Sequence, residues 1–273
     1  MIDMEYIRGF YPPYIAQSAG MQKHMLKEYV ELLALEWITR SPYAAKMVFI
    51  GGTNLRLIQG IDRFSEDLDF DCKGLSENEF RQMSDDLVKY LQLQGLNAEL
   101  RNKESARLTA FRSNVHFPEL LFDLQLTGHR EERFLMKIEA QDQGVDYPRE
   151  MAIVQRNGFS FPVPVPPLSV LLSMKLCALL TRQKGRDFYD AMFLMQRTEP
   201  DYAFLHQQKG IANKEQLDAA LREMVAQTDM KKKQRDFEHL LLDSRKSESI
   251  LHFIPNSLTR KSLIPNSKIT NRN

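Results

Sequence analysis

Two neighbouring stretches decide the fold: Met47-Val-Phe-Ile-Gly-Gly-Thr-Asn-Leu-Arg-Leu57 and Asp67-Leu-Asp-Phe-Asp-Cys72. The first is a short apolar run that ends in Gly51-Gly52, which predicts a buried strand running into a tight turn. Thr53 is then expected to cap a short helix that reaches Ile58. The second stretch alternates acidic and apolar residues, which predicts a strand with one polar face.

The segments around this unit predict a mixed α/β domain that extends to about residue 165. Apolar residues three and four positions apart predict a helix over 25–38, and residues 77–93 read as another helix. Short alternating runs separated by turn residues predict strands near 97–102, 107–116, 120–126 and 133–141.

A proline-rich segment, Phe161-Pro-Val-Pro-Val-Pro-Pro167, predicts a connector, because proline stiffens the chain and donates no ladder hydrogen bond. The chain after it reads as helices over 168–183, 187–197, 201–208, 214–227 and 231–244. We therefore expect one domain over residues 1–165 and a helical domain over 166–273. The polar tail after Pro255 is expected to be mobile.

The composition is that of a globular protein. The chain has 273 residues, of which 43% are hydrophobic and 27% charged, which excludes a mostly disordered, collagen-like or disulfide-scaffold chain. Its two cysteines are too few for a disulfide framework or a zinc site. The N-terminus lacks the basic and apolar regions of a signal peptide, and the apolar stretch 168–180 is shorter than the roughly 20 residues that span a bilayer. These features predict a cytoplasmic protein with no membrane contact.

The net charge of +1 hides an uneven distribution. Residues 1–166 carry a net charge of −5 and residues 167–273 carry +6. A basic half can attract a polyanion and an acidic half can hold cations, although imbalance between two solvated surfaces explains the same numbers.

The glycine turn and the acidic strand together suggest a site for a nucleotide and a metal. Glycines let backbone N–H groups approach a phosphate closely. Asp67 and Asp69 are two residues apart on the predicted strand, so their side chains project from the same face. Two adjacent carboxylates repel each other unless a cation lies between them, and magnesium is the usual cation. Asp71 shares this face and is a possible third member.

A third carboxylate could come from the run Phe134-Leu-Met-Lys-Ile-Glu-Ala140, where Lys137 and Glu139 face the same way. Glu139 could join the aspartate pair, but its spacing alone favours an exposed residue that pairs with a base on a neighbouring strand. Asp123 is a rival candidate from another predicted strand.

The start of the basic half contains a third group of polar residues. Lys175 and Arg182 share one face of an otherwise apolar helix, where the lysine could meet a triphosphate as a point charge. Asp187 and Asp190 can share a face at the start of the next helix. Arg186 and the two aspartates also fit an ordinary cap with salt bridges, and a lysine in the middle of an apolar helix speaks mildly against that reading.

These motifs, in this order, resemble the AbiEii/AbiGii toxin family, nucleotidyltransferase-like proteins of type IV toxin–antitoxin and phage-defence systems. The resemblance rests on the segments 49–57 (FIGGTNLRL), 63–70 (RFSEDLDF), 137–139 (KIE), Lys175 with its following residues, and 186–190 (RDFYD). It implies an α+β fold, in which a polymerase-β-like nucleotidyltransferase domain with a mixed sheet precedes a helical domain.

The resemblance also implies roles for individual residues. Asp67, Asp69 and Glu139 are expected to bind Mg²⁺ and to be catalytic together with Lys175 and Asp187. The residues expected at the nucleotide are Gly51, Gly52, Thr53, Arg56, Lys175, Arg182, Arg186 and Asp190.

The expected reaction moves a nucleoside monophosphate from an NTP to an acceptor hydroxyl. Some relatives add nucleotides to the acceptor end of tRNA and so block translation, and the basic segment Lys231-Lys-Lys-Gln-Arg235 suits an RNA backbone or is simply a solvated helix face. Other acceptors would be a protein hydroxyl or a small molecule, and a third possibility is a nucleotide-binding module without catalysis. We also expect a monomer, and the family suggests an antitoxin that acts without forming a stable complex.

Overall fold

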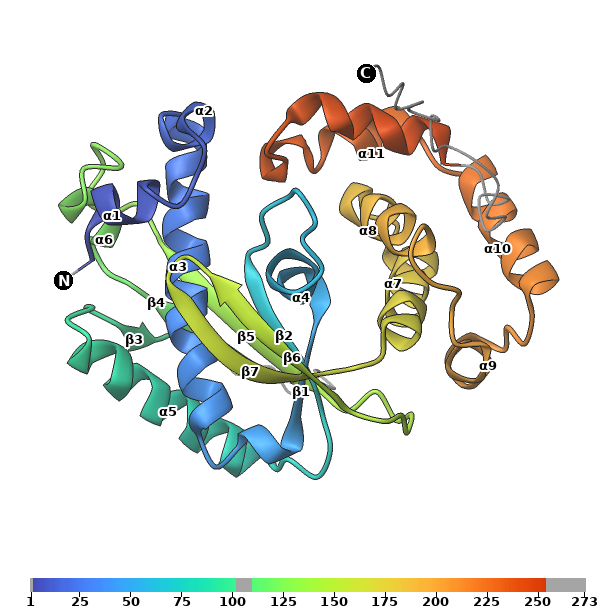
Figure 1. Cartoon of the computed structure of the whole chain (residues 1–273), viewed down its shortest axis with the longest axis horizontal. Helices are drawn as coiled ribbons and strands as arrows, with labels where there is room; N and C mark the ends of the chain where they lie inside the picture. The colour runs from blue at the N-terminus through green and yellow to red at the C-terminus, as the bar shows by residue number, and fades with distance from the viewer. Residues whose placement is uncertain (1, 102–109, 254–273) are drawn as a thin grey trace, which may run out of the picture.

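The computed structural model describes residues 2–101 and 110–253 (Figure 1). The tail after Pro255, expected to be mobile, lies outside the described residues. The elements of the N-terminal half are α1 (Met4–Arg8), α2 (Pro13–Ala16), α3 (Ala19–Arg40), η1 (Ala44–Lys46), β1 (Met47–Ile50), α4 (Gly51–Leu57), β2 (Asp67–Cys72), α5 (Glu77–Leu93), β3 (Glu99–Leu100), β4 (Phe111–His116), α6 (Leu120–Asp123), β5 (Leu135–Gln141), β6 (Glu150–Arg156) and β7 (Phe159–Val165). Those of the C-terminal half are α7 (Leu168–Arg182), α8 (Gly185–Met195), α9 (Tyr202–Lys209), α10 (Lys214–Ala226), α11 (Met230–Arg235), η2 (Glu238–Leu240) and η3 (Ser244–His252).

A five-stranded mixed sheet has the strand order β1-β2-β5-β4-β3. Strands β2 and β5 are parallel, and the other neighbours run antiparallel. A separate two-stranded ribbon is formed by β6 and β7. The parallel pair matters most for function, because it brings the acidic strand directly beside the strand that carries Glu139.

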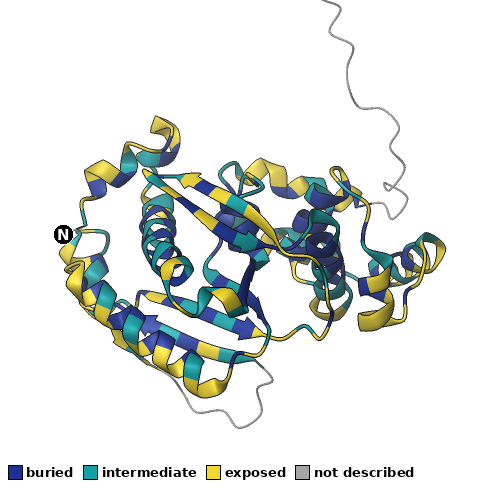
Figure 2. Cartoon of the chain, turned by 60° about the horizontal axis from the view of Figure 1, so that its bottom comes forward, coloured by how far each residue is buried: buried dark blue, intermediate teal, exposed yellow. Residues whose placement is uncertain are grey.

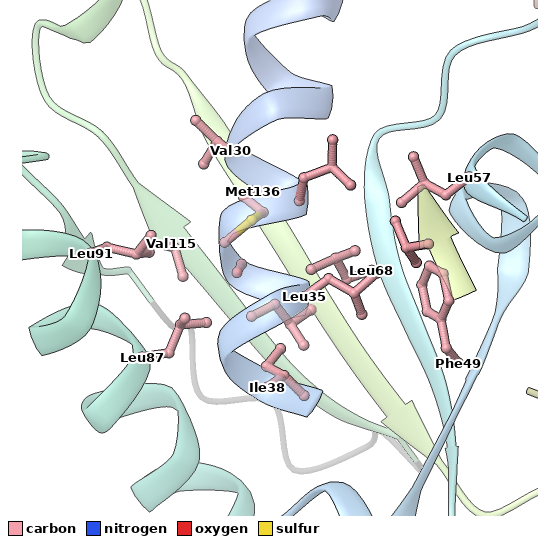
Figure 3. Close-up of a cluster of buried hydrophobic side chains, with 14 of the residues drawn as sticks. Val30, Leu35, Ile38, Phe49, Leu57, Leu68, Leu87, Leu91, Val115 and Met136 are labelled. Carbon is pink, nitrogen blue, oxygen red and sulfur yellow. The ribbon is translucent and has the colours of Figure 1, made fainter. Parts of the chain in front are cut away.

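Helices α3 and α5 cover one face of the sheet. Leu35 and Ile38 of α3 pack over Leu68 of β2, and Leu87 of α5 packs near Val115 of β4 (Figure 3). Side chains alternate across a strand, so burying Leu68 on this face turns Asp67 and Asp69 to the opposite face. The hydrophobic core therefore determines on which side of the sheet the carboxylates lie.

Local signals explain several boundaries. Helix α5 begins with a capping box, in which the Ser76 hydroxyl accepts from the Glu79 backbone N–H and the Glu79 carboxylate accepts from the Ser76 N–H. The prediction that Thr53 caps the next helix is wrong, because α4 begins at Gly51. Thr53 lies inside its first turn and donates its hydroxyl to the carbonyl of Asp67 at 2.5 Å.

Three other local predictions are wrong. The proline-rich segment is not a connector, because its first part belongs to β7, where Phe161, Val163 and Val165 are buried and the intervening prolines lie on the other face. Each strand of a two-stranded ribbon has a free edge, where proline is tolerated. The expected strand 120–126 contains the short helix α6, and the last expected helix ends at Arg235, followed by 3₁₀ turns.

The helical half has a hydrophobic cluster of its own, contributed mainly by residues from Leu171 to Phe253. Leu55 of α4 and Ile61 of the following loop join this cluster, so α4 packs between the two halves. In Figure 2 buried residues gather on the inner faces of the helices and exposed residues on their outer faces. Within the described residues no helix is both long enough and apolar enough to cross a membrane.

We expect Leu68→Ala to lower the free energy of unfolding by about 2–5 kcal/mol, because it opens a cavity between the sheet and α3. Leu68 is fully buried. Leu93→Ala is the matched control, since Leu93 is 85% exposed and its loss should change stability by no more than about 0.5 kcal/mol. Urea denaturation followed by circular dichroism measures both, and equal effects would contradict the assigned core.

Candidate active site

A pocket of about 200 Å³ lies where β2 and its neighbours face α7 and α8. Its lining consists almost entirely of charged and polar residues. They are Gly52, Arg63, Ser65, Asp67, Asp69, Arg112, Lys137, Glu139, Lys175, Arg182, Lys184 and Arg186. We call Asp67, Asp69 and Glu139 the acidic wall, and Lys175, Arg182, Lys184 and Arg186 the basic wall.

The register of the parallel pair builds the acidic wall. Asp69 of β2 lies beside Glu139 of β5, and Asp67 lies beside Lys137. Burial and the neighbouring Asp67 carboxylate raise the pKa of Asp69 to about 6. Asp69 therefore carries its negative charge at an energetic cost that a nearby cation would relieve.

Two bases already contact these carboxylates. The Lys137 ammonium lies 3.3 Å from Asp67 Oδ2 and 3.7 Å from Glu139 Oε1. Arg112 of β4 places its Nε 2.9 Å from Glu139 Oε1. Among the described residues, no three histidine, cysteine, aspartate or glutamate side chains are arranged as a metal site. The carboxylates do match the oxygen ligands that magnesium prefers, so the donor chemistry fits this ion.

The glycine turn is shaped by its close approach to the acidic strand. Gly51 has a φ of +82°, and a Cβ there would come within 2.6 Å of the Asp69 Cβ. A Cβ on Gly52 would lie 2.6 Å from Ser65 Oγ and 2.9 Å from Arg63 Nη2. Gly51 therefore requires glycine, whereas a side chain at Gly52 would displace Ser65 or Arg63; Gly52 also borders the pocket directly.

A buried carboxylate holds the lysine of the basic wall. Asp190 of α8 is fully buried and accepts two hydrogen bonds from Arg63, at 2.7 and 2.6 Å. The Lys175 ammonium lies 2.8 Å from the same carboxylate. Burial alone would raise the pKa of Asp190, but the charges and hydrogen bonds of Arg63 and Lys175 lower it to about 2. Asp190 thus stays ionised and fixes the position of Lys175.

A second buried aspartate, Asp187, orients Arg182 of the basic wall. Asp187 accepts hydrogen bonds from Arg182 Nε at 3.0 Å and Nη2 at 2.8 Å. It also accepts from the Lys184 backbone N–H at 3.1 Å, at the start of α8. Arg186 is next to this turn and borders the pocket. The charged groups of Arg182 and Arg186 therefore lie across the pocket from the acidic wall.

The structure brings together only part of the predicted site. The predicted residues that line the pocket are Gly52, Asp67, Asp69, Glu139, Lys175, Arg182 and Arg186. Gly51, Thr53, Asp187 and Asp190 lie directly behind this lining and hold it in place.

Arg56 does not belong to the pocket. Its side chain is buried, donates to Glu28 Oε2 at 2.5 Å and to the Ile61 carbonyl at 3.2 Å, and lies over the ring of Phe64. The rival carboxylate Asp123 borders a different, open hollow of about 590 Å³ at α6. Asp71 accepts from Tyr147 and the Gln143 N–H instead of facing the pocket.

Sequence reasoning missed five lining residues: Arg63, Ser65, Arg112, Lys137 and Lys184. Lys137 had a visible signal, because it shares a strand face with Glu139. For Arg63, the only sign in the sequence was its place in the motif just before Asp67. Its partner Asp190 is 127 residues away, so no local pattern reveals the pair.

Several solved structures match this chain, and two of them show the shared fold. MenT4, a nucleotidyltransferase toxin from Mycobacterium tuberculosis H37Rv, matches with a TM-score of 0.56 at 15% identity, covering 94% of this chain and 99% of that one. JHP933 from Helicobacter pylori matches with a TM-score of 0.50 at 20% identity, covering 86% and 91% of the two chains. The predicted α+β fold is confirmed as nucleotidyltransferase-like. A sequence comparison with curated proteins gave no match.

The family follows from the sequence itself. The model of the nucleotidyl transferase AbiEii toxin family, of type IV toxin–antitoxin systems, matches residues 33–256. That range covers most of the chain, so the chain belongs to this family and is a nucleotidyltransferase. The resemblance drawn from the motifs is confirmed.

We expect Asp190→Asn to lower the free energy of unfolding by about 3–5 kcal/mol at neutral pH, because it leaves two buried bases without a counter-charge. The folded pKa of about 2 lies below the ordinary value of 3.8, so Asp190 stabilises the protein above pH 3.8 and loses this effect as the pH falls toward 2. The difference in free energy of unfolding between wild type and Asp190→Asn should therefore narrow as the pH falls from 3.8 toward 2. Denaturation at several pH values measures it.

Asp146→Asn is the control, because Asp146 pairs with Lys73 through a side chain that is 97% exposed. Its stability should stay close to that of wild type. A difference between wild type and Asp190→Asn that did not depend on pH would contradict the assigned role of the buried carboxylate.

Proposed function

We propose that this pocket transfers a nucleoside monophosphate from an NTP to an acceptor hydroxyl with Mg²⁺, and that the acceptor is the 3′ end of tRNA. One observation carries the proposal: a single pocket holds an acidic wall opposite a basic wall. Transfer from a triphosphate needs cations at the phosphates and carboxylates near the attacking hydroxyl, and both are available here.

The basic wall would bind the triphosphate. Lys175 is pinned by Asp190 and Arg182 by Asp187, so both charges are held in place before the nucleotide arrives. Lys184 and Arg186 add charge at the same side of the pocket. Positioned cations stabilise the charge that develops on the leaving pyrophosphate without having to reorganise.

The acidic wall would hold the divalent cation and receive a proton. Asp67, Asp69 and Glu139 supply carboxylate oxygens, and a bound Mg²⁺ would supply Lewis-acid stabilisation of charge on the reacting oxygens. The acceptor oxygen forms a bond to the α-phosphorus while the bond to the pyrophosphate breaks. Glu139 would accept the hydroxyl proton in this step.

Positive charge outside the pocket supports an RNA acceptor. Helix α11 packs against α8, and the Gly185 N–H donates to Asp236 at 3.0 Å, which places α11 beside the basic wall. Lys231, Lys232 and Arg235 of α11 are exposed. An RNA strand could follow these charges into the pocket. Blocking the 3′ end of tRNA in this way would stop translation, which suits a phage-defence toxin in the cytoplasm. In this proposal the protein acts as a monomer, and its antitoxin forms no stable complex with it.

We expect Asp69→Asn to lower nucleotide transfer by on the order of a hundredfold to a thousandfold. The fold should persist, because the neutral side chain removes a charge that burial and Asp67 already disfavour. The assay mixes the protein with tRNA and α-³²P-labelled NTPs, with Mg²⁺ or with EDTA, and follows label on tRNA.

Asp123→Asn, in the separate hollow, is the matched control and should keep full activity. An active Asp69→Asn protein would refute the proposed site. Label on protein in place of tRNA would move the acceptor to a side-chain hydroxyl, and NTP binding without transfer would indicate a small-molecule acceptor or a binding module.

We expect the double substitution Lys231→Glu and Lys232→Glu to reduce labelling of tRNA, at limiting tRNA, by on the order of tenfold, because two phosphate contacts become repulsive. NTP binding should not change. The matched control is Arg81→Glu with Lys89→Glu on α5, exposed bases on the helix that covers the opposite face of the sheet. Equal losses in both double variants would argue against an RNA path over α11.

A further inference from the structure

The acidic wall is part of a charge pattern that the sheet register imposes. On the face opposite α3, one row across the strands contains Asp67, Lys137 and Asn114. The next row contains Asp69, Glu139 and Arg112. Each row therefore places a base immediately beside a carboxylate of the acidic wall.

Lys137 has the most central position in this pattern. Its ammonium contacts both Asp67, at 3.3 Å, and Glu139, at 3.7 Å, so it bridges two of the three carboxylates. Its Cα is fixed beside that of Asp67 by the parallel pairing. A side-chain rotation can move the ammonium within the pocket, but it cannot remove the lysine from the acidic wall.

An ammonium and a divalent cation cannot share the same carboxylates without strong repulsion. The lysine side chain is 34% exposed and borders the same pocket as the basic wall, so it has room to turn toward another anion. An incoming triphosphate would provide that anion. The cation and the lysine would then exchange partners when the nucleotide binds.

We propose that Lys137 is a positioning residue that acts as a tethered cation: it holds the acidic wall together in the metal-free protein and weakens the binding of a free divalent cation. The inference rests on the proposed use of the acidic wall for Mg²⁺. It implies that the cation binds well only together with the nucleotide, whose phosphates can accept the lysine.

The test measures Mn²⁺ binding to the full chain without nucleotide, using electron paramagnetic resonance to count free Mn²⁺. Lys137→Met should bind Mn²⁺ on the order of fivefold more tightly than wild type, the size expected from a partly exposed ion pair. The melting temperature of this variant should be lower than that of wild type without Mn²⁺ and should rise more when Mn²⁺ is added. Lys137→Gln serves as a second variant if Lys137→Met does not fold.

Lys73→Met is the matched control, because it makes the same change of charge just beyond the end of the neighbouring strand β2. The Lys73 side chain is 33% exposed and pairs with Asp146 outside the pocket. Its Mn²⁺ affinity should equal that of wild type, so tightening by both variants would reveal a general charge effect and overturn the inference.

Other results separate this inference from the proposed function. Equal or weaker Mn²⁺ binding by the Lys137 variants overturns the tethered-cation role, and if wild type still labels tRNA with Mg²⁺, the proposed function survives. A wild-type protein that neither binds Mn²⁺, with or without NTP, nor transfers nucleotide overturns both.

Discussion

The buried carboxylate of Asp190 is the interaction on which the rest of the site depends. It joins Arg63, from the loop before β2, to Lys175, from the middle of α7. The same loop is tied to the C-terminal half by a hydrogen bond from the Phe64 N–H to the Leu240 carbonyl at 2.7 Å. A pocket assembled from two halves of a chain needs such a joint, because its opposing charges act together only if their separation is fixed.

The two walls of the pocket obtain their rigidity in different ways. Sheet register fixes the acidic wall, because the pairing of β2 with β5 determines which side chains are neighbours. Buried aspartates fix the basic wall, because Asp190 and Asp187 each hold a long, flexible base. Long basic side chains lose much conformational entropy when they bind a ligand, and holding them beforehand reduces that loss.

The sequence predicts best what local interactions determine. The start of α5 follows from its capping box, and the strand of Asp67 and Asp69 follows from its alternation. The prediction of a connector at 161–167 is wrong because it considered only the local effect of proline on the chain. In the ribbon of β6 and β7, the side of β7 away from β6 has no ladder partner among the described residues, so proline is tolerated there. The resemblance to the family implied that Arg56 lies at the nucleotide, but the buried Glu28 holds its side chain elsewhere. The pairing of Arg63 with Asp190 joins residues 127 positions apart, and no spacing rule predicts it.

The prolines of β7 have a consequence beyond the local fold. Pro162 and Pro164 lie opposite Ile153 and Met151 of β6, and a proline is tolerated in such a ladder where its nitrogen points away from the partner strand. The missing N–H groups therefore fall on the outer edge of the ribbon. An extended chain that approached this edge would find too few donors to pair with, so strand pairing along it is disfavoured.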